Sequence, residues 1–110
     1  MSIFGDCSEG PNGPIGTWDV SLVTDMKDMF HGARRFDQDI SKWNVSSATD
    51  MSRMFWKAVA FDQDISAWDM SRVKDMSYMF ASAFFFNRNF CTRFLGTVAV
   101  RRAALLDKYM

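Results

Sequence analysis

Aspartate is the residue type in this chain whose repeated spacing could support chemistry. Aspartates recur at intervals of 25 residues in two groups. The first group is Asp25, Asp50 and Asp75, and the second is the pair Asp37 and Asp39, repeated as Asp62 and Asp64. Like charges stacked this way repel each other by about 1 kcal/mol per pair at 4 Å in water. A calcium ion, which binds several oxygen ligands, would relieve that repulsion.

The alternative is that these carboxylates have structural roles. Aspartate accepts hydrogen bonds from backbone N–H groups at helix starts and in turns. In the third copy Asn87 and Asn89 replace both acids of the second group, which keeps a turn role but weakens a metal role. We therefore predict structural roles and no metal site, and a calcium-binding module remains the weaker alternative.

No other constellation points to catalysis. His31 is the single histidine, and Cys7 and Cys91 lie near opposite ends of the chain. One histidine and two distant cysteines do not make a zinc site, and the sequence lacks a phosphate-binding glycine loop and a G-x-S-x-G motif. We predict that the chain is not an enzyme, with no catalytic residue and no cofactor.

The elements that must position these residues come from an internal repeat. The segments beginning at Trp18 and Trp43 are identical at 15 of 25 positions, and a third, looser copy begins at Trp68. A fixed period of this size indicates units that bury their apolar faces by stacking on their neighbours.

Each copy contains two different spacing patterns of apolar residues. The first is Ile40-x-x-Trp43-x-Val45, which has the spacing of a leucine-rich repeat and predicts a short strand. The second consists of Ala48, Met51, Met54, Phe55 and Ala58, which are mostly three or four residues apart and predict a short helix or 3-10 turn. Thr49 and Asp50 suit the start of that helix.

The fold predicted from this pattern is α/β: a short leucine-rich-repeat-like solenoid of about three coils, each with one strand and one helix or 3-10 turn. We expect an N-terminal coil or cap over 1–14, solenoid repeats over 15–91, and a C-terminal capping helix or tail over 92–110. Residues at equivalent positions should form internal ladders: Trp18, Trp43 and Trp68; Phe30, Phe55 and Phe80; and Phe36, Phe61 and Phe86.

Composition excludes several classes of partner. Lys plus Arg and Asp plus Glu both total 13, so no net charge attracts nucleic acid or an anionic membrane. No stretch reaches the roughly 18 apolar residues of a membrane helix, and the first ten residues lack the pattern of a secretory signal. Whether Cys7 and Cys91 pair stays open.

A solvent-facing side of the predicted strands is the expected binding surface. Solenoids bind partners on such extended surfaces, and the residues there vary between copies. Trp56 breaks the repeat, since His31 and Ala81 occupy the matching positions, and we expect it to be exposed and important for binding. The predicted partner-binding residues are Thr17, Asp19, Lys42, Asn44, Asp69 and Trp56.

The repeat resembles a known family. The motif W-D-V-S-x-V-T-D-M-x-x-M-F, together with F-D-Q-D-I-S, is similar to the BspA-like leucine-rich repeats of about 25 residues found in many surface proteins of bacteria, mycoplasmas and protists. The resemblance covers residues 15–90. It implies a leucine-rich-repeat-like solenoid, a role in adhesion or protein binding, a cell-surface or extracellular location, and no catalytic residues.

Three functions remain open at this point. The first is a non-enzymatic, adhesion-type module that binds a protein partner of unknown identity on the solenoid surface. The second is a structural unit that self-associates end to end through its terminal coils. The third is the calcium-binding module. We predict no nucleic-acid partner and no membrane insertion, and the sequence leaves the compartment unassigned.

Overall fold

The computed structural model describes residues 13–89. Two helical elements are present in this range: the 3-10 helix η1 (Ile15–Thr17) and the α-helix α1 (Phe84–Arg88). The remaining described residues form turns and extended segments, with isolated parallel bridges joining Asp25 to Asp50 and Asp50 to Asp75. The predicted C-terminal capping helix over 92–110, most of the N-terminal segment 1–14, and both cysteines lie outside the described residues.

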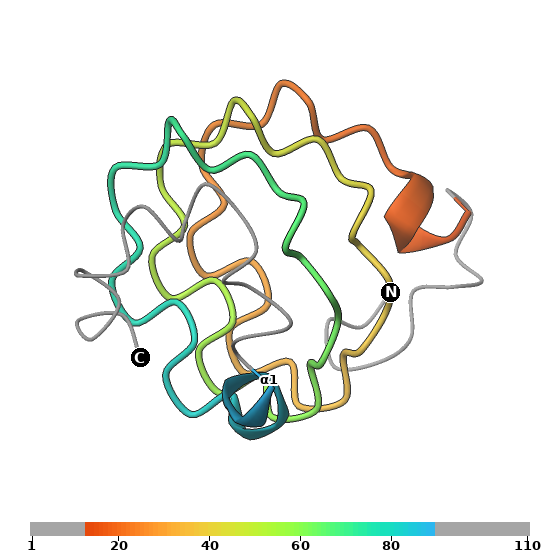
Figure 1. Ribbon diagram of the computed structural model, residues 1–110, viewed down its shortest axis with the longest axis vertical. Coiled ribbons are helices and arrows are strands. Elements are labelled where there is room, and N and C mark those ends of the chain that lie inside the picture. Colours follow the sequence, from red (N-terminus) through yellow and green to blue (C-terminus); the bar gives the residue numbers. More distant parts are fainter. Residues whose placement is uncertain (1–12, 90–110) are drawn as a thin grey trace.

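The described backbone winds through three successive turns that lie side by side (Figure 1). We call these turns the first coil (15–39), the second coil (40–64) and the third coil (65–89). They follow one another in Figure 1 as orange, yellow-green and green-to-blue segments, with η1 opening the first and α1 near the end of the third.

Neighbouring coils are joined by backbone hydrogen bonds that run mainly in one direction. Alternate N–H groups of the first coil donate to carbonyl oxygens 24 residues ahead at 2.7–3.1 Å: Met26 to Asp50, Asp28 to Ser52, Phe30 to Met54 and Gly32 to Trp56. The second coil repeats this towards the third at 2.8–2.9 Å: Met51 to Asp75, Arg53 to Ser77, Phe55 to Met79 and Lys57 to Ala81. We call this the inter-coil ladder.

The inter-coil ladder explains why the predicted helix over 48–58 does not form. A helix uses every N–H group inside one segment, whereas alternate N–H groups here serve the next coil. The other N–H groups close tight turns three residues back, such as Met54 to Met51 at 3.2 Å. Arg53 and Lys57 also have φ values of 56° and 63°, which a right-handed helix forbids. The alternative prediction of 3-10-type turns describes these residues better.

The predicted strand at Trp43–Val45 also differs from the structure, which assigns no strand in the described residues. Trp43 and Val45 nevertheless point inward and are buried, while Asn44 between them is exposed. Inward and outward side chains therefore alternate here without a regular strand. The backbone of residues 43–45 makes no series of hydrogen bonds with a neighbouring coil, which a strand in a sheet would require.

The core consists of aromatic columns that cross the coils. Stacked rings in neighbouring coils are 5.5–5.9 Å apart in two columns: Phe30, Phe55 and Phe80, and Phe36, Phe61 and Phe86. Within each coil the two phenylalanines also stack, at 4.1–4.2 Å. The columns predicted from the repeat are confirmed, and stacked aromatic pairs stabilise a fold beyond the effect of their buried area.

The tryptophan ladder is confirmed for two of its three members. Trp43 and Trp68 are buried and stack at 6.5 Å with an angle of 5° between their rings. Trp18 is only partly buried and packs against the edge of the core. Its indole N–H donates to the Gly13 carbonyl at 3.3 Å, five residues away.

Candidate functional site

Three of the predicted partner-binding residues occupy one repeat position and close a local turn. Asp19, Asn44 and Asp69 are exposed, and the Oδ1 atom of each accepts the backbone N–H of the serine two residues later at 3.0–3.1 Å. In the first two coils the serine hydroxyl donates to the same atom at 2.6 Å. One oxygen of each side chain therefore has a structural role.

These turns also lower the pKa of the two aspartates. The Ser21 hydroxyl, followed by the Ser21 backbone N–H, lowers the pKa of Asp19 below its usual 3.8. The Ser71 hydroxyl and N–H lower the pKa of Asp69 in the same way. This position therefore carries a negative charge in the first and third coils and a neutral amide, Asn44, in the second.

The aspartates of the inter-coil ladder have the same local function. Asp25 accepts the Lys27 N–H at 3.0 Å, and Asp50 accepts the Ser52 N–H at 2.9 Å. Asp75 accepts the N–H and hydroxyl of Ser77 at 2.9 and 2.6 Å, which together lower the pKa of Asp75. The prediction that these carboxylates accept backbone N–H groups is confirmed, although they cap tight turns and not helices.

The second aspartate group divides between local turns and contacts across coils. Asp39 and Asp64 each accept the N–H of the serine two residues on at 2.9 Å, as predicted. Asp37 instead accepts the Asp62 N–H and the Gln63 side-chain amide from the second coil, both at 2.8 Å. Within residues 13–89 no three His, Cys, Asp or Glu side chains are grouped so that they could hold a metal ion.

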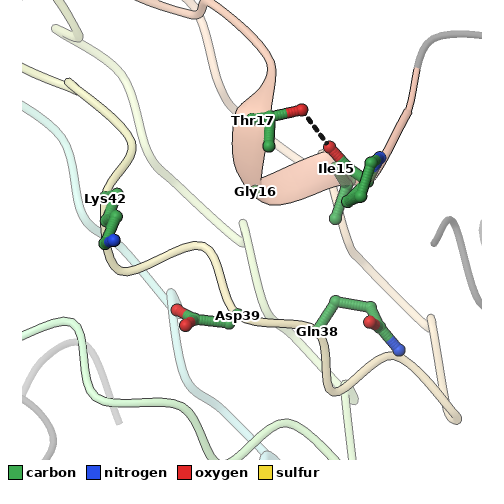
Figure 2. A pocket seen from close by; sticks show the side chains of 7 residues that line it. Ile15, Gly16, Thr17, Gln38, Asp39 and Lys42 are labelled. Carbon is green, nitrogen blue, oxygen red and sulfur yellow. Dashed lines mark hydrogen bonds between the residues drawn. The ribbon is translucent and has the colours of Figure 1, made fainter.

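Thr17 and Lys42, two further predicted binding residues, meet at a shallow pocket of about 250 Å³. Figure 2 shows η1 on one side of it and Gln38, Asp39 and Lys42 on the other. The Thr17 hydroxyl donates to the Pro14 carbonyl at 2.7 Å. A Cβ at Gly16 would overlap the Asp39 carbonyl, so only glycine permits η1 to approach the Asp39 backbone, at the end of the first coil, this closely.

Asp39 gives this pocket a negative charge beside the lysine. The Ser41 hydroxyl and N–H lower the pKa of Asp39, and the Lys42 charge adds a smaller effect in the same direction. Both side chains are exposed. The pocket can therefore offer one carboxylate and one ammonium group to a polar ligand or a partner surface.

Trp56, the last predicted binding residue, belongs to an aromatic row outside the core. Its ring stacks on His31 at 4.9 Å with an angle of 3°, and on Tyr78 at 5.8 Å with an angle of 24°. The Lys57 ammonium lies 5.5 Å from the Trp56 ring centroid, within the range of a cation–π contact. We call His31, Trp56 and Tyr78 the outer aromatic row.

The outer aromatic row corrects one expectation and adds a residue. Trp56 is partly buried between its neighbours and not fully exposed as predicted. Tyr78, whose exposed fraction is 56%, was missed because it occupies a different repeat position from Trp56. Its φ of 56° places the backbone in the left-handed region at this position. Tyrosine rarely adopts that conformation, so the residue type gives no indication of it in the sequence.

A charged cluster adjoins the outer aromatic row. Arg53 donates to Asp28 Oδ2 at 3.0 Å, and His31 Nδ1 lies 3.3 Å from Asp28 Oδ1. All three side chains are more than a third exposed, so these pairs contribute little to stability. The cluster nevertheless fixes the orientation of His31, because one side of its ring contacts Trp56 while its edge faces the carboxylate.

The contacts of the described residues divide the six predicted residues into three groups. Thr17 and Lys42 line the shallow pocket, whereas Asp19, Asn44 and Asp69 follow one repeat position across the coils. Trp56 lines neither that pocket nor a second one of about 360 Å³, which contains Lys27, Asp50, Arg53, Asp75 and Tyr78 among its lining residues. Tyr78, which stacks on Trp56, connects the outer aromatic row to this second pocket.

The described part of the chain contains no helix with the length and apolar character needed to cross a membrane.

Comparison with known proteins gives one match. The model of a family described as "Mycoplasma protein of unknown function, DUF285" matches residues 1–101. No curated protein and no solved structure matches the chain significantly.

Proposed function

The chain belongs to this DUF285 family of Mycoplasma proteins of unknown function, and from that premise we propose that it is a BspA-like surface repeat module that binds a protein partner without catalysis. In this proposal its three coils form a short leucine-rich-repeat-like solenoid. The 25-residue copies and the regular inter-coil ladder support that reading.

The outer aromatic row is the single observation that supports partner binding most. Its rings lie outside the buried core, and each is held by stacking against its neighbour. Tryptophan and tyrosine supply large contact areas, and a ring already held in place loses little conformational entropy on binding. Such a row suits the centre of a protein–protein interface better than it suits a reaction.

The remaining predicted residues would extend this binding surface or form a second one. Lys42 and Asp39 present opposite charges at the shallow pocket, and charges at the rim of an interface accelerate association more than they strengthen it. The column of Asp19, Asn44 and Asp69 retains one oxygen or amide group per residue that no described turn uses.

Adhesion of coated beads to cultured animal cells would test this function. Beads would carry the full chain, the Trp56→Ala variant, the Tyr78→Ala variant or a Thr17→Ala/Lys42→Ala double variant. Leu22→Ser is a matched control, since the Leu22 side chain is 89% exposed and belongs to neither surface. Thermal melts of each variant would show that the fold is retained.

We expect the full chain and Leu22→Ser to bind equally, and Trp56→Ala to weaken binding by about tenfold or more, as an interface hot spot does. Tyr78→Ala should weaken binding by less. Loss of binding only in the Thr17→Ala/Lys42→Ala variant would assign the contact to the shallow pocket. Beads with the full chain that adhere no better than uncoated beads would overturn the adhesion proposal.

A further inference from the structure

The two outer coils present opposite halves of the inter-coil ladder. On the third coil, the backbone N–H groups of Met76, Tyr78 and Ser82 donate to no acceptor within residues 13–89. We call these groups the donor row. On the first coil, four backbone carbonyl oxygens accept no hydrogen bond from the described residues, and we call them the acceptor row: Asp25, Lys27, Met29 and His31.

These rows match in position as well as in polarity. Inside the chain, the N–H groups of Met51, Arg53 and Lys57 pair with the third coil, and they are the equivalents of Met76, Tyr78 and Ser82 one repeat earlier. The carbonyl groups that accept from the first coil belong to Asp50, Ser52, Met54 and Trp56, which are the equivalents of the acceptor row.

A third element of the ladder matches too. The Thr24 carbonyl accepts the N–H groups of Thr49 and Asp50, and the Thr49 carbonyl accepts those of Lys74 and Asp75. Lys74 is the equivalent of Thr24 and Thr49 in the third coil, so its carbonyl would accept the next pair of N–H groups. Thr24 and Asp25 are the equivalents of these donors in the first coil. Each of these end groups lacks a partner among the described residues.

We propose that the chain self-associates head to tail, with the acceptor row of one copy pairing with the donor row of another. Backbone groups that are unpaired at an edge recruit another chain of complementary pattern. The occupant that fits here is a second copy, because its first coil carries the acceptors at the spacing that the chain itself uses twice. A contact between two different surfaces extends into open chains or larger rings of copies instead of closing as a two-fold dimer.

This contact is confined to the ladder and is therefore weak. The aromatic columns end in residues that are already covered, since Phe30 is 5% exposed and Phe86 is 0% exposed. The side chains beside the rows are more accessible: Asp25, Lys27, Tyr78 and Ser82 are exposed. A few backbone hydrogen bonds without a large apolar area give low affinity.

One pair of exposed side chains would report the contact. Thr24, Thr49 and Lys74 occupy the same repeat position, so the proposed contact places Lys74 of one copy one coil away from Thr24 of the next, roughly 4.8 Å. Within a single copy the second coil separates the two residues. A charge at position 24 therefore acts mainly across the contact.

Sedimentation equilibrium of the full chain over a wide concentration range would measure this association. Thr24→Glu and Thr24→Lys would each be made in the native background and with Lys74→Glu. We expect the average mass to rise beyond that of a dimer with concentration. In the native background Thr24→Glu should strengthen association about twofold to fivefold, and Thr24→Lys should weaken it similarly.

The background with Lys74→Glu should reverse both signs, and high salt should reduce all four effects because both side chains are exposed. Thermal melts would show that the variants remain folded. A mass that stays monomeric at the highest concentration reached would overturn the proposal. So would association whose strength does not respond to position 24, or one that stops at a dimer.

Discussion

The indole N–H of Trp68 donates to the backbone carbonyl of Ile40 at 3.1 Å, across the boundary between the third and second coils. Trp43 makes the equivalent bond to Ile15 at 2.8 Å. Both tryptophans are buried, and each indole adds a second hydrogen bond to a carbonyl of the preceding coil. The Ile40 carbonyl also accepts the Trp43 backbone N–H, and the Ile15 carbonyl also accepts the Trp18 backbone N–H, both at 3.1 Å.

We predict that Trp68→Phe destabilises the protein by about 0.5–1.5 kcal/mol beyond the change in packing, because it removes one of the two hydrogen bonds to the Ile40 carbonyl. Urea unfolding would measure the loss. Trp18→Phe is the matched control, since its indole is partly buried and its bond to Gly13 is longer, at 3.3 Å. An equal loss in the two variants would show that the hydrogen bond is not the cause.

Ser82→Gly should raise the melting temperature. Ser82 has a φ of 60°, where an L residue with a side chain loses about 1–2 kcal/mol. Glycine removes that strain. It also raises the entropy of the unfolded chain, which costs about 0.4–1 kcal/mol of stability, so the net effect is stabilising. Calorimetry would measure the shift, and an unchanged or lower melting temperature would contradict this account.

Gly32 provides the reverse test at the equivalent position in the first coil. It has a φ of 73°, and a Cβ there would meet no atom within 4 Å. Gly32→Ala should therefore lower stability through backbone strain without a steric clash, by about 1 kcal/mol after the loss of unfolded-state entropy is subtracted. Calorimetry would measure this change too.

Ser77→Ala should raise the pKa of Asp75 towards 3.8, since the Ser77 hydroxyl is the main cause of its lowered value. A carboxyl whose pKa is lower in the folded than in the unfolded state stabilises the fold above the unfolded pKa. That stabilisation is lost as the pH falls through the lowered folded pKa. The variant should therefore be less stable than the native chain at neutral pH, and the difference should shrink well below pH 3.8. NMR titration of the carboxyl group and urea unfolding would measure both effects.

Ser46→Ala is the control for this prediction. Ser46 makes the same type of contact, at 2.6 Å, to the Oδ1 atom of Asn44, which does not titrate. Its loss should change stability by a similar amount at every pH. A pH-dependent change in that variant would show that the serine acts through some other group.

Millimolar calcium, or its removal by a chelator, should leave the melting temperature unchanged. A ligand that binds only the folded state raises that temperature. The aspartate Oδ1 atoms already accept backbone N–H groups, and the part of the chain from 13 to 89 has no cluster of three metal-binding side chains. A calcium-dependent rise that the chelator reverses would restore the calcium-binding alternative.

The repeat period predicted which residues meet across coils, and it failed where backbone conformation decides. Phe30 with Phe55, and Trp43 with Trp68, follow from equal positions in successive copies. The spacing of Met51, Met54 and Phe55 fits a helix, but it fits a series of tight turns equally well. Pairing of alternate N–H groups with the next coil excludes the helix, and that pairing has no local sequence signal.

The candidate surfaces were predicted only in part for the same reason. Asp19, Lys42 and Asn44 were correctly placed in solvent by the alternation of apolar and polar residues. The stacking of Tyr78 on Trp56 joins different repeat positions, so a comparison of equal positions could not find it. The hydrogen bonds from the Ser21 N–H and hydroxyl to the Asp19 carboxylate depend on a turn that only the structure shows.

The regular inter-coil ladder has a consequence for how such a protein can change in length. The first and second coils donate to the following coil from backbone N–H groups at the same four repeat positions. Insertion or deletion of a whole 25-residue unit leaves every junction chemically equivalent. A change of one residue more or less would bring the buried Met51 level with the exposed Asp25 or Lys27 of the neighbouring coil. Evolution can therefore alter the number of units freely, while shifts within a unit are selected against.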